Sequence, residues 1–380
     1  MSAAALPSYE QWGNLTGKRV LVRVDFNEPV ALVDGQRHVS DDFRIRAAIP
    51  LFEDLLQRGA AVVACTHFGR PRGHVDDEFS IEPVRRRLNE LCGDVELMEN
   101  LRFFPGEEAN DPEFGASLIA GFDYFINEAF SVSHRAHASI MIPPTLVPSA
   151  AGPYLQHEVA TLEALLISPA RPFVAIVGGA KVGDKLGVVK MLSQKADTVL
   201  VGGGMAYTFE RAQGRSIGSS LFDARYLLEC DQLLAQGNVL IPADSRGLAD
   251  GLAVGSVGGG APVVEFGENI PDGFEGFDIG PRAVEAFQAV IASAGTILWN
   301  GPMGVFEDDR FISGTQAVAH AIVSSGAVSV VGGGDSVAAL QMLGLEEKVT
   351  FVSTGGGACL QLVELGDLPG LRVLRESRPS

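Results

Sequence analysis

The stretch that most constrains the fold runs over residues 171–209, RPFVAIVGGAKVGDKLGVVKMLSQKADTVLVGGGMAYTF. Its first apolar run, Phe173 to Val177, is flanked by proline and glycine and is too short for a helix, so we expect a buried strand. Apolar residues at helical spacing follow from Asp184, and a second apolar run, Thr198 to Val201, ends at three glycines. This order predicts a strand–helix–strand unit of a parallel sheet, with glycines at the carboxyl end of both strands.

Ligands of such sheets bind where the strands end, because glycines let the backbone approach a phosphate and the next helix presents unpaired N–H groups. Lys181 and Lys185 follow the first glycine turn one helical turn apart, so we expect both to face an anion there. Two common nucleotide motifs are absent. A P-loop needs Gly-Lys-Ser/Thr, and a dinucleotide fingerprint starting at Gly202 needs a glycine where the chain has Tyr207. The unit therefore predicts an anion site that neither motif explains.

Length and composition limit the class of protein. The chain has 380 residues, which is long for one hydrophobic core, and we expect two domains. Its formal net charge of −18 argues against a nucleic-acid or anionic-membrane partner. The four cysteines are scattered without a C-x-x-C pair, and neither a signal-peptide pattern nor a long apolar stretch is present. These features predict a reduced, cytoplasmic protein without disulfides, a zinc site or a membrane span.

Four predicted strands of the first half lead into polar segments that supply arginine or histidine. These segments are DFNEP at 25–29 with the following DDFRIR at 41–46, THFGRP at 66–71, ENLRF at 99–103 and NEAFSVSHRAHAS at 127–139. Residues 1–155 hold 14 Lys and Arg residues, and only one of them is Lys. Because a guanidinium group can bind a phosphate or carboxylate through two parallel hydrogen bonds, this bias favours recognition of such a group.

The second half contains three more strand ends with glycine or polar residues. They are NGPMGVFE at 300–307, GGGDS at 332–336 and STGGGA at 353–358. Their irregular spacing indicates repeated turns of one sheet rather than a repeat protein. The cluster Gly258 to Gly260 follows no clear strand, and we expect a turn there. Between the halves, residues 150–168 show an amphipathic helical pattern after a proline-rich break, which predicts a connecting helix.

Taken together, these segments resemble the phosphoglycerate kinase family over nearly the whole chain. The matching motifs, in the order of the family, are VRVDFN, DDFRIR, THFGRP, ENLRF, HRAHAS, GGAKVGDK, GGGMAYTF, WNGPMGVFE, GGGDS and STGGGA. The resemblance implies an α/β fold of two doubly wound parallel-sheet (Rossmann-like) domains joined by a helix. The phosphoglycerate-binding domain would span residues 1–153, with the tail 362–380 packed back on it. The connecting helix would span 154–170, and the nucleotide-binding domain 171–361.

The resemblance also implies an enzyme, a phosphotransferase with a carboxyl group as acceptor. Such a kinase transfers a phosphoryl group reversibly between 1,3-bisphosphoglycerate and MgADP, giving 3-phosphoglycerate and MgATP, in glycolysis and gluconeogenesis. A hinge motion would close the two domains around the substrates. Mg²⁺ would enter with ATP or ADP, and we expect a monomer that binds neither nucleic acid nor membrane.

Site residues follow from the matching motifs, position by position. The residues that would bind phosphoglycerate are Asp25, Asn27, Arg44, His67, Arg70, Arg102 and Arg135. The residues that would bind the nucleotide are Gly179, Ala180, Lys181, Lys185, Gly203, Gly204, Asn300, Pro302, Glu307, Gly334, Asp335 and Ser336, with Asp335 also holding the metal. The residues that would act on the transferring phosphoryl group are Arg44, Lys181, Lys185, Gly356 and Gly357.

Two departures from the family pattern bear on function. LCGDVEL at residues 91–97 spans what is normally a strand and a helix, so the N-terminal domain is expected to lack about one βα unit. Glu28 replaces an apolar residue beside Asn27, which could alter the pocket for the sugar acid. Two alternatives therefore stay open: a degenerate, non-catalytic paralogue that binds nucleotide or an anion, and a kinase for another small carboxylate. A hydride-transferring dehydrogenase is disfavoured because the dinucleotide fingerprint is absent.

Overall fold

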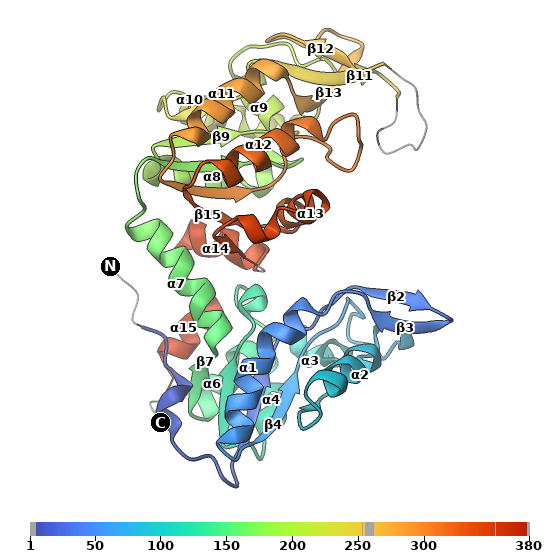
Figure 1. Ribbon diagram of the computed structural model, residues 1–380, viewed down its shortest axis with the longest axis vertical. Helices are drawn as coiled ribbons and strands as arrows, with labels where there is room; N and C mark the ends of the chain where they lie inside the picture. Colours follow the sequence, from blue (N-terminus) through green and yellow to red (C-terminus); the bar gives the residue numbers. More distant parts are fainter. Residues whose placement is uncertain (1–4, 253, 255–261, 354, 378–380) are drawn as a thin grey trace. The chain divides into compact units, whose positions relative to one another are not determined.

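The computed structural model describes residues 5–252, 254, 262–353 and 355–377. The chain divides into two compact units, of which unit 1 comprises Met1–Thr161 with Leu365–Ser380 and unit 2 comprises Leu162–Glu364. The boundary between them falls within helix α7, Pro153–Ile167. Figure 1 shows the helices of each unit packed around its sheet. The turn expected at Gly258 to Gly260 lies outside the described residues.

Unit 1 is built on a five-stranded sheet of order β5-β4-β1-β6-β7, in which all neighbours are parallel. The strands, in chain order, are β1 (Arg19–Arg23), β4 (Ala61–Cys65), β5 (Glu96–Leu97), β6 (Tyr124–Asn127) and β7 (Ser149–Ala151). From the central β1 the chain moves outward to β5 and then returns to the other side of β1. The order therefore reverses between β1 and β6, and their carboxyl ends form the edge where ligands of open α/β sheets bind.

Helices cover both faces of this sheet. The helical elements are η1 (Tyr9–Trp12), α1 (Phe43–Gln57), η2 (Asp77–Phe79), α2 (Glu82–Leu91), η3 (Leu101–Phe103), α3 (Pro105–Glu108), α4 (Pro112–Ile119), η4 (Phe130–Val132), α5 (Ala138–Met141), α6 (Pro143–Leu146), α7 and α15 (Pro369–Arg375). Side chains of β1 alternate between the faces: Val20 and Val22 pack in the cluster of α1 and α2, whereas Leu21 packs in the cluster of α4. This alternation follows from the two-residue period of a strand.

Two features of unit 1 differ from the sequence expectation or were missed by it. The spacing of apolar residues after DDFRIR predicts a helix from Ala47 to Arg58, but α1 begins four residues earlier, at Phe43, so Arg44 lies in its first turn. A two-stranded hairpin of β2 (Val30–Val33) and β3 (Gln36–Val39) was not expected. Its turn residues Asp34 and Gly35 have φ of 51° and 77°, the left-handed region that a tight hairpin turn requires.

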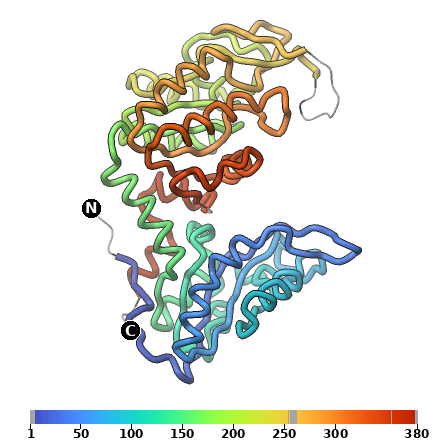
Figure 2. The backbone as a smooth tube through the Cα atoms, in the orientation of Figure 1, coloured from blue at the N-terminus to red at the C-terminus, as the bar shows by residue number. Residues whose placement is uncertain are grey.

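The last described helix, α15, follows unit 2 in sequence yet belongs to unit 1, where it contacts α5, α6 and β7. Leu371 and Leu374 are fully buried there, and the backbone N–H of Gly370 donates to Ser133 O at 2.9 Å. Figure 2 shows this red segment among the blue and green parts of the tube. Residues after the unit 2 segment therefore complete the core of unit 1.

Unit 2 contains a six-stranded parallel sheet of order β10-β9-β8-β14-β15-β16. Its strands are β8 (Phe173–Val177), β9 (Thr198–Val201), β10 (Val239–Leu240), β14 (Thr296–Asn300), β15 (Val328–Val331) and β16 (Phe351–Val352). The strand order reverses between β8 and β14, which both end in glycine-rich turns. Residues 171–209, with which the sequence analysis began, thus form the centre of this sheet, and their two strands, β8 and β9, have the predicted bounds.

Helices flank this sheet, and a second sheet accompanies it. The helical elements are η5 (Val182–Asp184), α8 (Leu186–Lys195), α9 (Ala206–Ala212), η6 (Ala224–Tyr226), α10 (Leu227–Leu234), α11 (Pro281–Ala292), α12 (Ser313–Ser324), α13 (Gly334–Leu343), η7 (Glu346–Lys348) and α14 (Gly357–Leu365). The antiparallel sheet, of order β12-β11-β13, consists of β11 (Ser245–Ala249), β12 (Val264–Phe266) and β13 (Phe274–Ile279). None of the helices in the described part of the chain combines the length and apolar character that a membrane crossing requires.

Candidate functional site

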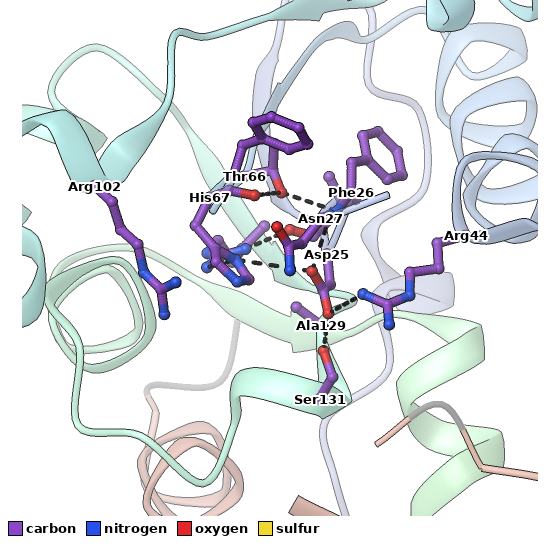
Figure 3. Close-up of polar contacts among 12 residues, drawn as sticks. Asp25, Phe26, Asn27, Arg44, Thr66, His67, Arg102, Ala129 and Ser131 are labelled. Carbon is purple, nitrogen blue, oxygen red and sulfur yellow. Dashed lines mark hydrogen bonds and ion pairs between the residues drawn. The ribbon is translucent and has the colours of Figure 1, made fainter. Parts of the chain in front are cut away.

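At the carboxyl end of β1, Asp25 is the centre of a polar network in unit 1 (Figure 3). Its Oδ2 accepts a hydrogen bond from Arg44 Nη1 at 2.9 Å and another from the hydroxyl of Ser131. Burial alone would raise the pKa of Asp25, but the neighbouring positive groups and the Ser131 hydroxyl hold it well below its usual range. Asp25 is therefore ionised at neutral pH and holds the Arg44 guanidinium in place.

The loop that follows Asp25 is fixed to the end of β4. Asn27 Oδ1 accepts from the backbone N–H of Gly69 at 2.8 Å, and the backbone N–H of Phe26 donates to Thr66 Oγ1 at 2.9 Å. These bonds join two strand ends that the sequence places about forty residues apart. They bring the expected residues Asn27 and His67 to the same edge of the sheet.

His67 is buried between Asp25 and a buried arginine. Its Nδ1 lies 3.7 Å from Asp25 Oδ1 and 3.4 Å from Arg23 Nη2. Burial and the surrounding arginines lower the pKa of His67 well below its ordinary value. His67 is therefore neutral at physiological pH and acts as a hydrogen-bonding group.

The sequence patterns did not indicate Arg23 as a site residue, although it is fully buried and donates to Ser139 Oγ at 2.9 Å.

The remaining expected arginines of unit 1 differ in how they are held. Arg102 is buried, and its Nη1 donates to Gly69 O at 2.6 Å while its Nε lies 3.2 Å from Glu108 Oε1. Figure 3 shows Arg102 and Arg44 on opposite sides of the Asp25 and His67 side chains. Arg135 is partly buried and donates to His134. Arg70 is exposed and has no hydrogen bond or ion pair with the described residues.

The arginines, and not the histidines, give this edge of unit 1 its positive charge. Burial, followed by the field of Arg102, lowers the pKa of His137 to about 4, and burial with Arg135 lowers the pKa of His134. Burial and Arg135 lower the pKa of Arg102 to about 10, so that it stays protonated at neutral pH. A cluster of arginines around neutral histidines suits a ligand with several negative charges.

In unit 2, Lys185 lies at the switch point between β8 and β14. Its Nζ donates to Gly178 O at 2.6 Å and to Asn300 O at 3.3 Å. Burial lowers the pKa of Lys185 to about 8, although the field of Asp335 opposes this shift. Lys181 is exposed and has no partner among the described residues, so the structure does not bring the two amines to a shared group.

Glycine is required at several positions of this region, because a Cβ atom there would clash with the backbone of a neighbouring turn. At Gly301 φ is +100°, and a Cβ there would lie 2.1 Å from Gly178 O and 2.4 Å from Lys185 Nζ. At Gly203 φ is +68°, and a Cβ would lie 2.7 Å from Gly179 N. The turns after β8, β9 and β14 thus come together as backbone without intervening side chains, which only glycine allows at these positions. Gly204 is similarly crowded, because its Cβ would lie 2.9 Å from Ala180 O.

Asn300 contributes a buried amide without a partner. Its side chain is almost fully buried, and neither Nδ2 nor Oδ1 has a hydrogen bond to any of the described residues. A Cβ at the neighbouring Gly333, where φ is +93°, would lie 2.9 Å from Asn300 Nδ2. Because an unpaired buried amide is costly, this position points to a ligand that supplies the missing partners.

The other expected nucleotide residues lie around the same turns. Pro302 is buried directly after Gly301, and Glu307 is exposed four residues after Met303. Ser336 accepts a hydrogen bond from the backbone N–H of Gly301, which ties α13 to the end of β14. Gly356 has φ of +48° and lies beside Gly357, the first residue of α14.

Magnesium fits the residues around Asp335. The Asp335 carboxylate is exposed in the first turn of α13 beside Gly334, and it forms no hydrogen bond or ion pair with the described residues. No group of three or more His, Cys, Asp or Glu side chains in the described parts of the chain could hold a metal alone. Mg²⁺ commonly takes one or two carboxylates and completes its shell with substrate phosphates and water, so a single carboxylate suffices.

A hollow of about 310 Å³ beside Lys181 was not expected from the sequence. Its lining includes Gly183, Leu221, Phe222 and Tyr226. Leu221 and Phe222 are 48% and 46% exposed, unusual for large apolar side chains. The dipeptide follows a serine-rich segment without a clear strand or helix pattern, so only the tertiary fold reveals that it faces the glycine turn.

Comparison with known proteins gives consistent findings. The family model described as phosphoglycerate kinase matches residues 11–96 and 91–365, and the two pieces meet where the shortening was expected. The chain is 48% identical to phosphoglycerate kinase of Rubrobacter xylanophilus over 387 residues, which cover 95% of this chain and 96% of the relative. It is 44% identical to the enzyme of Acaryochloris marina over 397 residues, covering 96% and 97%.

Solved structures of the same description match the fold. Phosphoglycerate kinase from Coxiella burnetii has a TM-score of 0.87 and 35% identity, covering 98% of this chain and 99% of that chain. The structure from Pyrococcus horikoshii has a TM-score of 0.79 and 30% identity, covering 97% and 98%. These matches confirm the predicted α/β fold with two Rossmann-like parallel sheets.

Proposed function

The chain belongs to the phosphoglycerate kinase family of phosphotransferases, and from this premise we propose how its own residues perform the reaction. The reaction is the reversible transfer of a phosphoryl group between 1,3-bisphosphoglycerate and MgADP, giving 3-phosphoglycerate and MgATP. The observation that carries the proposal is the convergence of Asp25, Arg44, His67 and Arg102 at one sheet edge of unit 1. Asp25, His67 and Arg102 follow strands β1, β4 and β5, and Arg44 lies in the first turn of α1; together they form a positively charged edge on a chain of net charge −18.

Unit 1 binds the phosphoglycerate. Its positive groups are Arg44, Arg70, Arg102 and Arg135, and Asn27 with neutral His67 supplies hydrogen bonds to the sugar acid. Arg70 and Arg44 retain exposed surface, which suits direct contact with the ligand. Arg23, which is buried, and Asp25, whose side chain is 11% exposed, hold the others in position.

Unit 2 binds the nucleotide. The adenosine site comprises the turns around Gly179, Ala180, Gly203 and Gly204 and the segment from Asn300 to Glu307, because their backbones approach one another closely at the ends of the strands. The hollow beside Lys181 suits the flat, largely apolar face of the base, because Leu221 and Phe222 border it. Lys181, Lys185 and Ser336 lie on the side of the phosphates, and Asp335 holds the magnesium.

Catalysis consists of positioning and of neutralising charge, because phosphoryl transfer leaves little covalent work for a protein. Arg44 of unit 1 and Lys185 of unit 2 stabilise negative charge on the transferring group, with the N–H groups at Gly356 and Gly357. Mg²⁺ would be held by Asp335 and would neutralise part of the charge of the nucleotide phosphates. Since the two substrates bind to different units, transfer requires a hinge motion that also excludes water.

The same proposal assigns the parts of the chain. Residues 1–153 with the tail 362–380 form the phosphoglycerate domain, 154–170 the connecting helix and 171–361 the nucleotide domain. Residues 1–4, 253, 255–261, 354 and 378–380 within these spans lie outside the described part of the chain. We expect the enzyme to work as a cytoplasmic monomer without a nucleic-acid or membrane partner.

The test is ADP release from MgATP with and without 3-phosphoglycerate. We expect release to depend on 3-phosphoglycerate and to be inhibited weakly, if at all, by other small carboxylates. If MgATP binds but release does not depend on 3-phosphoglycerate, the assignment of unit 1 is wrong. Activation by a different carboxylate would identify a kinase of altered specificity, and activation by none would identify a non-catalytic paralogue.

A further inference from the structure

Glu28 lies three residues after Asp25 and contacts the helix that carries Arg44. It is 5% exposed, and its Oε1 accepts hydrogen bonds from the backbone N–H groups of Arg44 at 2.8 Å and Ile45 at 3.3 Å. We propose that Glu28 is a positioning residue: its carboxylate anchors the first turn of α1 and thereby sets where the Arg44 guanidinium lies. The proposal rests on the role proposed above for Arg44.

The first turn of α1 depends on this distant carboxylate. The residue at the helix N-cap, Asp42, makes no capping hydrogen bond with its side chain, which instead pairs with Arg46 and Arg87. The N–H groups of a first helical turn have no partner inside the helix and need an external acceptor. Glu28 supplies that acceptor for two of them, and its negative charge also lies at the favourable end of the helix dipole.

One short loop therefore holds Arg44 at both ends. Asp25 binds its guanidinium, and Glu28 binds its backbone N–H. The loop itself is tied to β4 through Thr66 and Gly69. A change at Glu28 shifts the backbone of Arg44 relative to Asp25, and small displacements of a catalytic group are costly in rate.

The charge on Glu28 is sensitive to its surroundings. Among the described residues, Arg44 favours the ionised form and Asp41 opposes it, while the two backbone N–H donors favour it. Burial outweighs these effects and raises the pKa of Glu28 to about 7. Hydrogen bonds to a carboxylate are stronger than those to a neutral carboxyl. The anchor should accordingly strengthen as the pH rises through neutrality.

The experiment compares Glu28→Gln, Glu28→Leu and a control, Asp244→Asn, by kcat, KM and thermal unfolding. Asp244 is 6% exposed and accepts from the backbone N–H groups of Arg282 at 3.0 Å and Ala283 at 2.8 Å, so it anchors α11 in unit 2 in the same way. We expect Glu28→Leu to lower kcat by about 10- to 100-fold with a smaller change in KM, Glu28→Gln to lower it less, and Asp244→Asn to leave kcat unchanged. A folded Glu28→Leu enzyme with kcat within twofold of wild type would overturn the proposal.

Two further readouts separate positioning from a general loss of stability. In the Arg44→Ala background, Glu28→Gln should have no additional effect on kcat, whereas a structural role would give additive losses. The wild-type kcat should fall on the acid side of an apparent pKa near 7, and this limb should be absent in Glu28→Gln. Additive losses, or an identical limb in both enzymes, would contradict the inference. Wild-type enzyme without 3-phosphoglycerate-dependent ADP release would instead count against the proposed function.

Discussion

The polar groups of the two candidate binding regions differ in how far they are already satisfied. In unit 1, Asp25 is bonded to Arg44 and Ser131, and Asn27 is bonded to Gly69. In unit 2, both amide atoms of Asn300 are buried without a partner, and Lys181 and Asp335 have none among the described residues. Asp25 and Asn27 are thus satisfied within the protein, whereas the Asn300 amide is not.

The two regions differ in whether their polar groups are arranged and hydrogen-bonded in the free protein or only in a complex with a ligand. Unit 1 places its charges before the substrate arrives, which is the arrangement that lowers reorganisation during the reaction. Unit 2 leaves polar groups unsatisfied in the protein alone, which destabilises that state and favours binding of a complementary ligand. Substitutions should therefore have opposite effects on stability in the two regions.

The largest expected effect is on rate. Arg44→Ala should lower kcat by roughly 10³- to 10⁵-fold, as for arginines that contact the transferring phosphoryl group. Binding of MgATP, measured by calorimetry, should be unchanged, because the proposed nucleotide residues all belong to unit 2. A rate loss below tenfold, or a parallel loss of MgATP affinity, would break the assignment of the two regions.

The corresponding residue of unit 2 is Lys185. Lys185→Met should lower kcat by about 10²- to 10³-fold, the usual cost of removing one group that stabilises developing charge. Steady-state kinetics with saturating MgATP measures the effect, and 3-phosphoglycerate binding serves as the unit 1 control. Full activity in Lys185→Met would show that the amine only donates hydrogen bonds to the backbone carbonyl groups of Gly178 and Asn300.

In unit 1, Asp25→Asn should destabilise the protein by about 1–3 kcal/mol, because it leaves the Arg44 guanidinium without its counter-ion. The loss is below that of a fully buried pair, since the Arg44 side chain is 32% exposed. The pKa of Asp25 lies below its unfolded value, so the stabilisation is present above about pH 5 and disappears in acid. Urea unfolding of both proteins across pH 3 to 7 tests this; a stability difference that grows towards pH 3 would refute it.

In unit 2, Asn300→Leu should have the opposite effect and raise the free energy of unfolding by about 1–3 kcal/mol, because methyl groups in the same branched arrangement replace two unsatisfied polar atoms. MgATP should bind more weakly to the variant. Thermal unfolding with and without MgATP gives both quantities. Equal destabilisation of Asn300→Leu and Asp25→Asn would remove the contrast between the regions.

The smallest expected effect is a proton uptake. The pKa of Lys185 is lowered to about 8 by burial, and a bound phosphate should raise it. MgATP binding should therefore take up a fraction of a proton at pH 8.5 and much less at pH 6.5, where Lys185 is already charged. Calorimetry in buffers of different ionisation enthalpy measures the uptake, with adenosine as the ligand that lacks phosphates. The same uptake at both pH values would exclude Lys185 as its source.

The sequence predicted most of the central strands because they are short apolar runs bounded by glycine or proline. Phe173–Val177 and Thr198–Val201 have the expected bounds. The antiparallel sheet of unit 2 was missed, since Gly247 and Gly276 interrupt any alternating pattern and pair with each other across β11 and β13. The early start of α1 was missed because its acceptor, Glu28, precedes Arg44 by 16 residues. Local patterns cannot reveal a cap supplied from that distance.

The candidate site was predictable only as a set of residue positions. Family motifs indicated Asp25, Arg44 and His67, but not that Ser131, 106 residues after Asp25, would bind the same carboxylate. Nor did they indicate the buried Arg23, which ordinary propensities would place in solvent. Burial and pairing at these positions depend on contacts between segments far apart in the chain, and only the fold brings them together.

The return of α15 to unit 1 has a consequence for biosynthesis. During translation, all residues of unit 2 are synthesised before Leu371 and Leu374. Until then, the surface of α5, α6 and β7 that α15 covers stays open to water and to other nascent chains. Unit 1 therefore begins the polypeptide but cannot complete its core until the synthesis of the chain is nearly finished. The segment carrying Ser131 and Arg135 would reach its final form only after the last helix has docked beside it.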